Sequence, residues 1–463
     1  MLANPIRHMK NKRSLQSLSA GLRGTVLVSL FGALSALNAA SASSADAVTL
    51  RMEVDRPVLL AGGDETAILK VALTGHRAAH VERAPVNLAI VIDRSGSMGG
   101  EKIARAREAA LEAVRRLAAD DVVSLITYNN TVEVIVPARR VGDGRALEDA
   151  IRRIQPGGGT NLYGGLERGA AEVRRRIEES YAHRVILLSD GLANVGPSTP
   201  QALGRFGAEL VRAGISVSTI GVGLDFNEDL MTRLARRSDG NTYFVENSSD
   251  LPRIFQQELG DVLSVVARRV VVEISFADGV RARRVIGRDG RITEGRVTVE
   301  LNQLYGGQEK FALIEVDVPA GEAGRKRELA SAEVVYESLD GTAIQRISTH
   351  TVVGYSRDET KVIAAANHAV QTDYAANRLA ETKDEVVELV DAGRREEASS
   401  LLASVGASLS SIASRFDNRA MADYAAPTAA EAERIEREGL DKAARKTYRA
   451  EAAQTVSQQK GAR

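Results

Sequence analysis

The sequence predicts an α/β domain with a doubly wound, mostly parallel sheet, inserted in an antiparallel β-sandwich and followed by a helical hairpin. Three observations support this architecture. Apolar strands alternate with amphipathic helices over residues 86–266, which is the pattern of an open parallel sheet covered by helices on both faces. Short alternating β patterns occupy both flanks, at residues 49–85 and 267–355. From residue 356 onward the chain is rich in Ala, Glu and Arg, with a helical period.

The composition limits the classes of function. A chain of 463 residues is long enough for two or three domains with full-sized cores. Lys and Arg together number 61, as do Asp and Glu, so net charge provides no attraction to nucleic acid or to an anionic membrane. Aromatic residues make up only 4% of the chain and Trp is absent, which argues against base-stacking surfaces. Cys is absent too, so the chain forms no disulfides, which is compatible with an oxidising compartment.

Residues 1–42 have the composition of a signal peptide. A basic segment up to Arg23 precedes an apolar stretch from Gly24 to about Leu37, and the small-x-small cleavage motif Ala40-Ser41-Ala42 follows. An uncleaved membrane anchor is the alternative, because the apolar stretch is only moderately shorter than a membrane span. Cleavage leaves no spanning segment, and we therefore expect a periplasmic or secreted bacterial protein.

The α/β part begins with a run, Leu88–Ile92, that is apolar at every position. Such a run is typical of a strand buried on both faces of a parallel sheet. The helix after it has one apolar stripe, because apolar residues recur at three- and four-residue steps from Ile103 to Leu117. Val132–Pro137 fits an antiparallel edge strand that is reached through a hairpin at Asn129-Asn130. Further strands are expected at Val122–Tyr128, Val185–Leu188, Ile215–Val222 and Tyr243–Val245.

Each of the two flanking β segments is too small to form a stable β-sandwich alone. Residues 49–85 contain two alternating runs separated by the turn Gly62-Gly63-Asp64. Residues 267–355 contain several more, with hairpin turns at Asp289-Gly290 and Asp340-Gly341. We therefore expect both segments to form one sandwich, with the α/β domain inserted between them. Two separate β pieces are the alternative.

The last quarter of the sequence is predicted to be helical. Residues 356–425 are expected to form a helical hairpin, with its turn at Asp391-Ala392-Gly393. Residues 426–463 are highly charged, and such a composition predicts a helical or disordered tail that is mostly solvated.

Three loops supply oxygen ligands at the ends of predicted strands, where open α/β sheets bind their ligands. The first loop carries a carboxylate and two hydroxyls, the second a hydroxyl behind a run of glycines, and the third a carboxylate. Hard oxygen ligands suit Mg²⁺, with Mn²⁺ or Ca²⁺ as alternatives. The five candidate metal ligands are Asp93, Ser95, Ser97, Thr160 and Asp190.

This constellation resembles the metal-ion-dependent adhesion site of the von Willebrand factor type A (VWA) family. The match comprises D-x-S-x-S at 93–97, G-G-T-N-L at 158–162 and S-D-G at 189–191. Three separated motifs are far more specific than D-x-S-x-S alone. The resemblance spans residues 86–266 and implies that family's Rossmann-like fold.

The resemblance also implies a role for each ligand. Ser95, Ser97 and Thr160 are expected to contact the metal directly, while Asp93 and Asp190 act largely through water. The predicted function is metal-dependent protein binding at the cell envelope, without catalysis. Neutral hydroxyl ligands leave the ion electrophilic, with at least one exchangeable coordination position. An Asp or Glu side chain from a partner protein can then complete its coordination shell.

Two other classes of function remain open. A metal-dependent hydrolase needs a positioned nucleophile or general base, but the chain has no Cys and no His at the carboxyl end of a predicted strand. A scaffold that acts through its helical C-terminal region, residues 356–463, would capture its partner through that region alone, insensitive to chelators.

Several neighbouring motifs have simpler structural interpretations. Asp93 and its serines could cap a helix. Gly157–Gly159 lacks the Gly-Lys-Ser/Thr of a nucleotide P-loop, and Gly221-Val222-Gly223 lacks the third glycine of a dinucleotide fingerprint and indicates a tight turn. His183 is expected at the surface. Three acidic residues near the next strand end could ring the metal site, but are rather expected to cap the following helix: Asp225, Glu228 and Asp229.

The last helix of the α/β part, about Ser249–Val266, is expected to run with little linker into the strand Arg268–Ile274. An axial shift of this helix therefore cannot be absorbed by slack, and metal ligation is predicted to change the interdomain angle. The resemblance to adhesion receptors with an inserted type A domain implies the same coupling. A coupling free energy of about 1–3 kcal/mol suffices for a useful switch.

Overall fold

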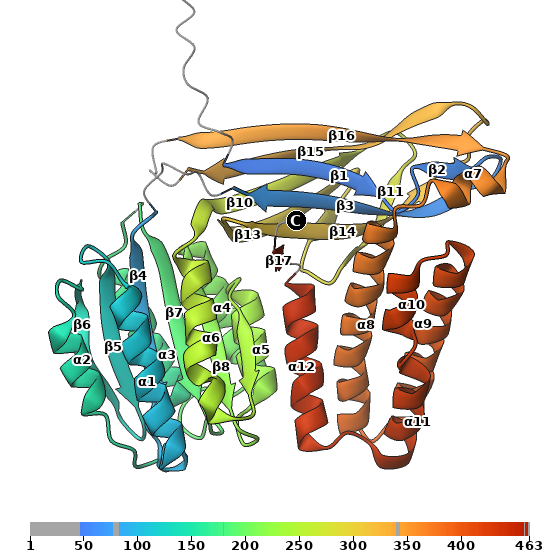
Figure 1. Cartoon of the computed structure of the whole chain (residues 1–463). Helices are drawn as coiled ribbons and strands as arrows, with labels where there is room; N and C mark the ends of the chain where they lie inside the picture. The colour runs from blue at the N-terminus through green and yellow to red at the C-terminus, as the bar shows by residue number, and fades with distance from the viewer. Residues whose placement is uncertain (1–46, 77–82, 179, 339–342, 458, 462–463) are drawn as a thin grey trace, which may run out of the picture. The chain divides into compact units, whose positions relative to one another are not determined.

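The computed structural model describes residues 47–76, 83–178, 180–338, 343–457 and 459–461. The predicted signal peptide and the turn at Asp340-Gly341 lie outside the described residues. The described part of the chain contains three β-sheets and a group of C-terminal helices (Figure 1). Within it, no helix combines the length and the apolar composition needed to cross a membrane.

The α/β domain contains a six-stranded sheet in the order β6-β5-β4-β7-β8-β9. All neighbouring strands are parallel except β5 and β6, which are antiparallel and flank the expected hairpin at Asn129-Asn130. The predicted α/β class with a mostly parallel sheet is confirmed. The strands are β4 (Val86–Asp93), β5 (Val122–Tyr128), β6 (Val132–Arg140), β7 (Ala182–Ser189), β8 (Ile215–Val222) and β9 (Thr242–Val245).

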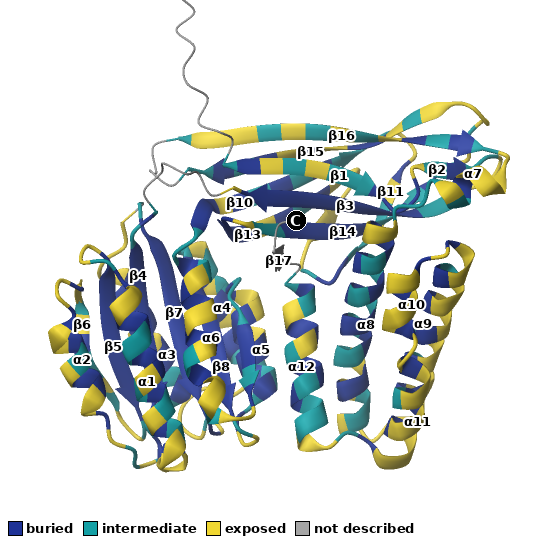
Figure 2. Ribbon diagram, in the orientation of Figure 1, coloured by how far each residue is buried: buried dark blue, intermediate teal, exposed yellow. Residues whose placement is uncertain are grey.

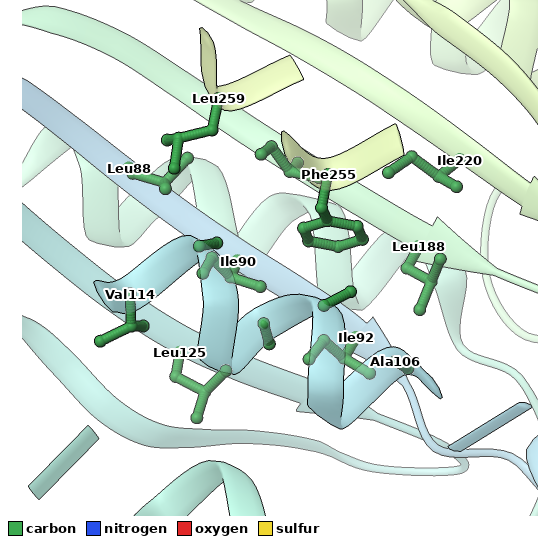
Figure 3. Close-up of a cluster of buried hydrophobic side chains, with 14 of the residues drawn as sticks. Leu88, Ile90, Ile92, Ala106, Val114, Leu125, Leu188, Ile220, Phe255 and Leu259 are labelled. Atoms are coloured by element: carbon green, nitrogen blue, oxygen red, sulfur yellow. The ribbon is translucent and has the colours of Figure 1, made fainter. Parts of the chain in front are cut away.

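Helices cover both faces of this sheet. Successive side chains of a strand point to opposite faces, so alternate residues of a strand pack against different helices. Leu88, Ile90 and Ile92 of β4 join a buried cluster with α1 and α6 (Figure 3). Ala89 and Val91 join a second cluster, with α3, α4 and α5. The whole of β4 is therefore buried (Figure 2). The helices are α1 (Glu101–Arg116), α2 (Arg145–Arg152), α3 (Leu162–Arg174), α4 (Pro200–Arg212), α5 (Glu228–Arg237) and α6 (Leu251–Val262).

Strands from both sides of the α/β domain share two further sheets. One sheet has the order β1-β3-β14-β11, with β17 also paired to β14, and the other has the order β12-β13-β10-β15-β16-β2. Apolar side chains from both sheets form one buried cluster, and we call this unit the two-sheet body. Its strands are β1 (Val48–Val54), β2 (Val58–Leu60), β3 (Glu65–Gly75), β10 (Val265–Phe276), β11 (Arg281–Ile286), β12 (Arg291–Thr293), β13 (Arg296–Tyr305), β14 (Gln308–Val318), β15 (Lys326–Glu337), β16 (Ile344–Ser356) and β17 (Gln459–Gly461).

The connection from α6 to β10 is short. Helix α6 ends at Val262 and β10 begins at Val265, so only Leu263 and Ser264 separate them. The helix was expected to continue to Val266, but the pairing of Val265 with Tyr305 begins the strand earlier.

The C-terminal helices enclose a core of their own, built by α8 to α12. Helix α12 lies against α8 and also against α5 of the α/β domain. This differs from the expectation of a solvated tail at residues 426–463. Lys446 and Arg449 of α12 are buried, because carboxylates on other elements neutralise them. The helices are α7 (Glu359–Ala364), α8 (His368–Asp391), α9 (Arg395–Arg415), α10 (Arg419–Ala425), α11 (Thr428–Glu438) and α12 (Lys442–Val456).

Candidate metal centre

The loops with the five predicted ligands all lie at the carboxyl edge of the α/β sheet. Asp93 is the last residue of β4, Asp190 directly follows β7, and Thr160 lies two residues before the start of α3. Ser95 and Ser97 belong to the 3-10 turn that follows β4. Because β4 and β7 are parallel neighbours, their loops meet at one edge of the sheet.

Hydrogen bonds join four of these five residues. Ser95 Oγ and Ser97 Oγ are 3.0 Å apart, and Ser97 Oγ donates to Asp190 Oδ1 at 2.7 Å. Asp93 Oδ1 accepts from the Ser95 backbone N–H at 2.8 Å. Its second oxygen, Oδ2, accepts from Ser189 Oγ at 2.8 Å. The fold therefore brings the first and third predicted loops into direct contact.

Gly191 shows that Thr160 belongs to the same group. A methyl group on Gly191 would lie 3.3 Å from Thr160 Oγ1 and 3.5 Å from Ser97 Oγ, so both hydroxyls face this glycine. The Thr160 N–H donates to Asn194 Oδ1 at 3.1 Å, and the Asn194 N–H donates to the Thr160 carbonyl at 3.2 Å. All five predicted residues therefore converge, and a side chain at position 191 would crowd the Thr160 hydroxyl.

Two asparagines that the sequence analysis assigned only to a hairpin hold the glycine loop in place. Asn129 Nδ2 donates to the Gly157 carbonyl at 2.6 Å, and the Gly159 N–H donates to Asn130 Oδ1 at 2.8 Å. Gly158 has a φ of +89°, and a methyl group there would lie 2.4 Å from Asn130 Oδ1. The glycine at this position therefore permits both the backbone conformation and the close approach of the hairpin. The only sequence signal for this role was the position of the two asparagines at the end of a strand.

The electrostatics of the group favour a cation. The side chains of Asp93 and Asp190 are buried. Burial raises the pKa of Asp93 to about 6, although hydrogen bonds from Ser95 and Ser189 act in the opposite direction. A buried carboxylate is unfavourable unless a positive charge compensates it. A cation is already present, since Lys102 Nζ lies 2.6 Å from Asp190 Oδ2.

The donor set fits a hard divalent cation, because it consists of two carboxylates and three hydroxyls and contains no nitrogen or sulfur. Across the described residues, no group of three or more His, Cys, Asp or Glu side chains is arranged to hold a metal. Binding at this edge would therefore depend on the hydroxyls as well as on the two carboxylates.

The next loop along this edge, between β8 and α5, differs from the expected capping arrangement. Asn227 caps α5, accepting from the Leu230 N–H at 3.0 Å. Glu228 and Asp229 instead bind α12, where Lys446 and Arg445 lie within ion-pair distance of them. Gly223 has a φ of +73°, which agrees with the predicted tight turn.

His183 is buried and does not lie at the surface as expected. Its Nε2 is 3.1 Å from the Glu178 carbonyl oxygen, and its Nδ1 is 3.2 Å from Asn87 Nδ2. It lies near the start of β7, at the opposite end of this strand from Asp190. It therefore plays no part in the candidate metal centre.

Residues 87–257 match the sequence model of the von Willebrand factor type A (VWA) domain family. These residues form a VWA domain. A solved von Willebrand factor type A protein from Catenulispora acidiphila has a similar fold, with a TM-score of 0.63 and 18% sequence identity. The similarity covers 80% of this chain and 87% of that one, so it extends beyond the VWA domain.

Curated relatives share part of their length with the chain. An uncharacterised protein of Synechocystis sp. is 31% identical over 189 residues, which is 41% of this chain and 44% of the relative. The uncharacterised protein YfbK of Escherichia coli is 26% identical over 231 residues, which is 49% of this chain and 40% of the relative. The chain thus spans less than half the length of either relative.

Proposed function

We propose that the VWA domain is a metal-dependent protein-binding module of the bacterial cell envelope. The observation that carries this proposal is the convergence of Asp93, Ser95, Ser97, Thr160 and Asp190 at one edge of the sheet, with only two carboxylates among them. VWA domains are mostly protein-interaction modules, which agrees with a binding role.

The proposed cation is Mg²⁺, with Mn²⁺ or Ca²⁺ as alternatives. Ser95, Ser97 and Thr160 would hold it directly, while Asp93 and Asp190 would act largely through water. The bound cation would supply an electrophile for one carboxylate oxygen of a partner's Asp or Glu. The charges of Asp93 and Asp190 together equal that of the divalent cation. The site therefore has no excess negative charge that would repel a partner's carboxylate.

Exposed apolar side chains support the same edge as the docking surface. Leu192 is 60% exposed and directly follows Gly191, which lies against Thr160 and Ser97. Leu224 is 37% exposed and follows Gly223, which lies near Lys102. An acidic partner residue with apolar neighbours would match this surface in charge and in hydrophobicity.

We propose that the VWA domain binds without catalysis and that the two-sheet body supports it. We infer that this body is a β-sandwich into which the VWA domain is inserted, and that the short α6–β10 connection transmits ligation to it. Small-angle scattering and hydrogen exchange of α6, each measured with and without Mg²⁺, test this coupling. Unchanged scattering and unchanged exchange would exclude it. Export to the periplasm or the cell exterior is proposed from the N-terminal sequence alone.

The primary test is Mn²⁺ binding by electron paramagnetic resonance, with Asp190→Ala compared with the wild type. The matched control is Asp225→Ala, which removes an exposed carboxylate on the adjacent loop. We expect saturable binding to the wild type and to the control, and a loss of at least about tenfold in affinity for Asp190→Ala. Equal affinity of all three proteins, or no binding to the wild type, would contradict the proposed ligands.

A second test addresses the partner. Chelator-sensitive capture from the native envelope should occur with the wild type and fail with Asp190→Ala. Turnover of generic phosphate esters with Mg²⁺ that is lost on Asp93→Ala would instead indicate a hydrolase. Capture by residues 356–463 that persists with a chelator would indicate the scaffold.

A further inference from the structure

Lys102 lies inside the candidate metal centre. It is the second residue of α1, and its Nζ is 2.6 Å from Asp190 Oδ2. Its side chain is 30% exposed, whereas that of Asp190 is fully buried. A methyl group on Gly223 would lie 3.5 Å from the same Nζ. The ammonium therefore lies between the end of β7 and the turn after β8.

The two oxygens of Asp190 have different partners. Oδ1 accepts the Ser97 hydroxyl at 2.7 Å, and Oδ2 accepts the Lys102 ammonium at 2.6 Å. Because Asp190 is one of only two carboxylates in the centre, a divalent cation and the Lys102 ammonium would compete for the same carboxylate. Their charges also repel each other, and repulsion is strong where water is largely excluded.

The net charge of the centre depends on this lysine. Asp93 and Asp190 contribute −2 and Lys102 contributes +1, which gives −1 before a metal binds. A divalent cation changes the total to +1 if Lys102 is present and to 0 if it is not. Lys102 thus opposes metal binding and makes the loaded centre attractive to an anion.

We propose that Lys102 is an internal competitor for the divalent cation and couples metal binding to binding of an acidic partner. The inference rests on the proposed function, since it concerns the same centre. A partner carboxylate compensates the excess positive charge, so metal and partner each increase the affinity for the other. The metal is then held weakly until the partner arrives.

The first test compares Mn²⁺ affinities of the full chain and its variants by electron paramagnetic resonance. Lys102→Met removes the charge and keeps most of the side-chain volume, Lys102→Arg keeps the charge, and Lys102→Gln provides a second neutral variant. Arg105→Met is the matched control, because Arg105 lies on the same helix and pairs with the exposed Glu101 and Glu108. We expect about tenfold tighter binding for both neutral variants and wild-type affinity for the other two.

The second test uses acetate as the carboxylate probe, at constant ionic strength against chloride. Acetate should tighten Mn²⁺ binding to the wild type more than to Lys102→Met. Equal enhancement in the two proteins, or wild-type or weaker Mn²⁺ affinity in both neutral variants, would overturn the inference. If the wild type binds Mn²⁺ and Asp190→Ala does not, the proposed function survives this failure. If no variant binds Mn²⁺, both proposals fall.

Discussion

The Lys446 ammonium of α12 lies 4.2 Å from the centre of the Phe226 ring and donates to the Phe226 carbonyl oxygen at 2.7 Å. The Phe226 ring in turn packs on Gly221, where a methyl group would come within 2.3 Å of it. Helix α12 therefore fixes the loop between β8 and α5. This loop also carries Gly223, which lies near Lys102, so the C-terminal helices contact the border of the candidate metal centre.

Removal of the Lys446 charge should weaken this contact. Lys446→Met leaves Glu228, a buried carboxylate, with one cationic partner fewer. We expect the free energy of unfolding to fall by about 2–4 kcal/mol, measured by urea denaturation. Hydrogen exchange of residues 223–229 should become faster at the same time.

The control for this prediction is Lys442→Met. Lys442 is one turn earlier on α12 and pairs with Asp225 at 3.6 Å, but both side chains are at least 75% exposed. Its removal should change the unfolding free energy by no more than about 0.5 kcal/mol. Equal effects of the two substitutions would show that α12 does not hold the β8–α5 loop.

A buried ion pair inside the VWA domain also contacts the two-sheet body through its arginine. Arg184 of β7 and Glu258 of α6 lie 3.5 Å apart, and both side chains are fully buried. Arg184 also donates to Gln303 at 3.3 Å and contacts the Tyr305 hydroxyl, both on β13. Arg184→Met should reduce the unfolding free energy by about 3–5 kcal/mol, because it leaves Glu258 buried without its cation.

A double-mutant cycle separates this interaction from simple loss of volume. The double variant Arg184→Met with Glu258→Gln should be less destabilised than the sum of the single variants. Strict additivity in urea unfolding would mean that the two charges do not interact in the folded protein.

His183 should make stability depend on pH. Burial lowers its pKa to about 4 from the ordinary value of 6.5. Between these values the unfolded state binds more protons than the folded state, so the stability contribution of neutral His183 is complete above about pH 6.5 and is lost as the pH falls. Between about pH 7 and about pH 5 we expect a loss of about 2 kcal/mol.

Urea unfolding at both pH values measures this loss, relative to His183→Gln. Since other groups also titrate in this range, the exposed His350 provides the comparison through His350→Gln. If the pH dependence persisted in His183→Gln and disappeared in His350→Gln, it would arise from His350, and the prediction for His183 would be wrong.

Metal binding should stabilise the VWA domain. The buried carboxylate of Asp93 has a raised pKa because burial disfavours its charge, and a cation would offset this. Mg²⁺ at about a hundred times its dissociation constant should add about 2.7 kcal/mol and raise Tm by several degrees. Differential scanning calorimetry should show the increase in the wild type. Asp190→Ala should show none, and an equal increase in that variant would place the ion elsewhere.

The five candidate ligands could be located in the sequence because the information that places them is local. Asp93 and Asp190 lie directly at the ends of apolar strands, and the parallel order of those strands brings their loops together. Asn194 was missed, because its contacts with Thr160 depend on the path of the loop after Asp190 and no periodic pattern specifies that path.

The contacts that were missed join distant parts of the chain. Lys102 reaches Asp190 across 88 positions and Lys446 reaches Glu228 across 218. The composition of α12 predicted a solvated helix. Composition alone does not show that carboxylates of another domain neutralise its cations. The burial of His183 was also missed, because it depends on the pairing of β4 with β7, which brings Asn87 against the imidazole ring.

The placement of the connections has a mechanical consequence. Arg268 at the start of β10 bonds the Tyr181 carbonyl just before β7, so the two-sheet body is attached at the amino ends of the strands, while the proposed partner binds at their carboxyl ends. A pulling force between partner and body would run along the strands and load their hydrogen bonds in shear. The domain would then unfold only if neighbouring strands slid past one another and broke their hydrogen bonds together. This orientation therefore resists tension better than one in which the inter-strand hydrogen bonds open one at a time.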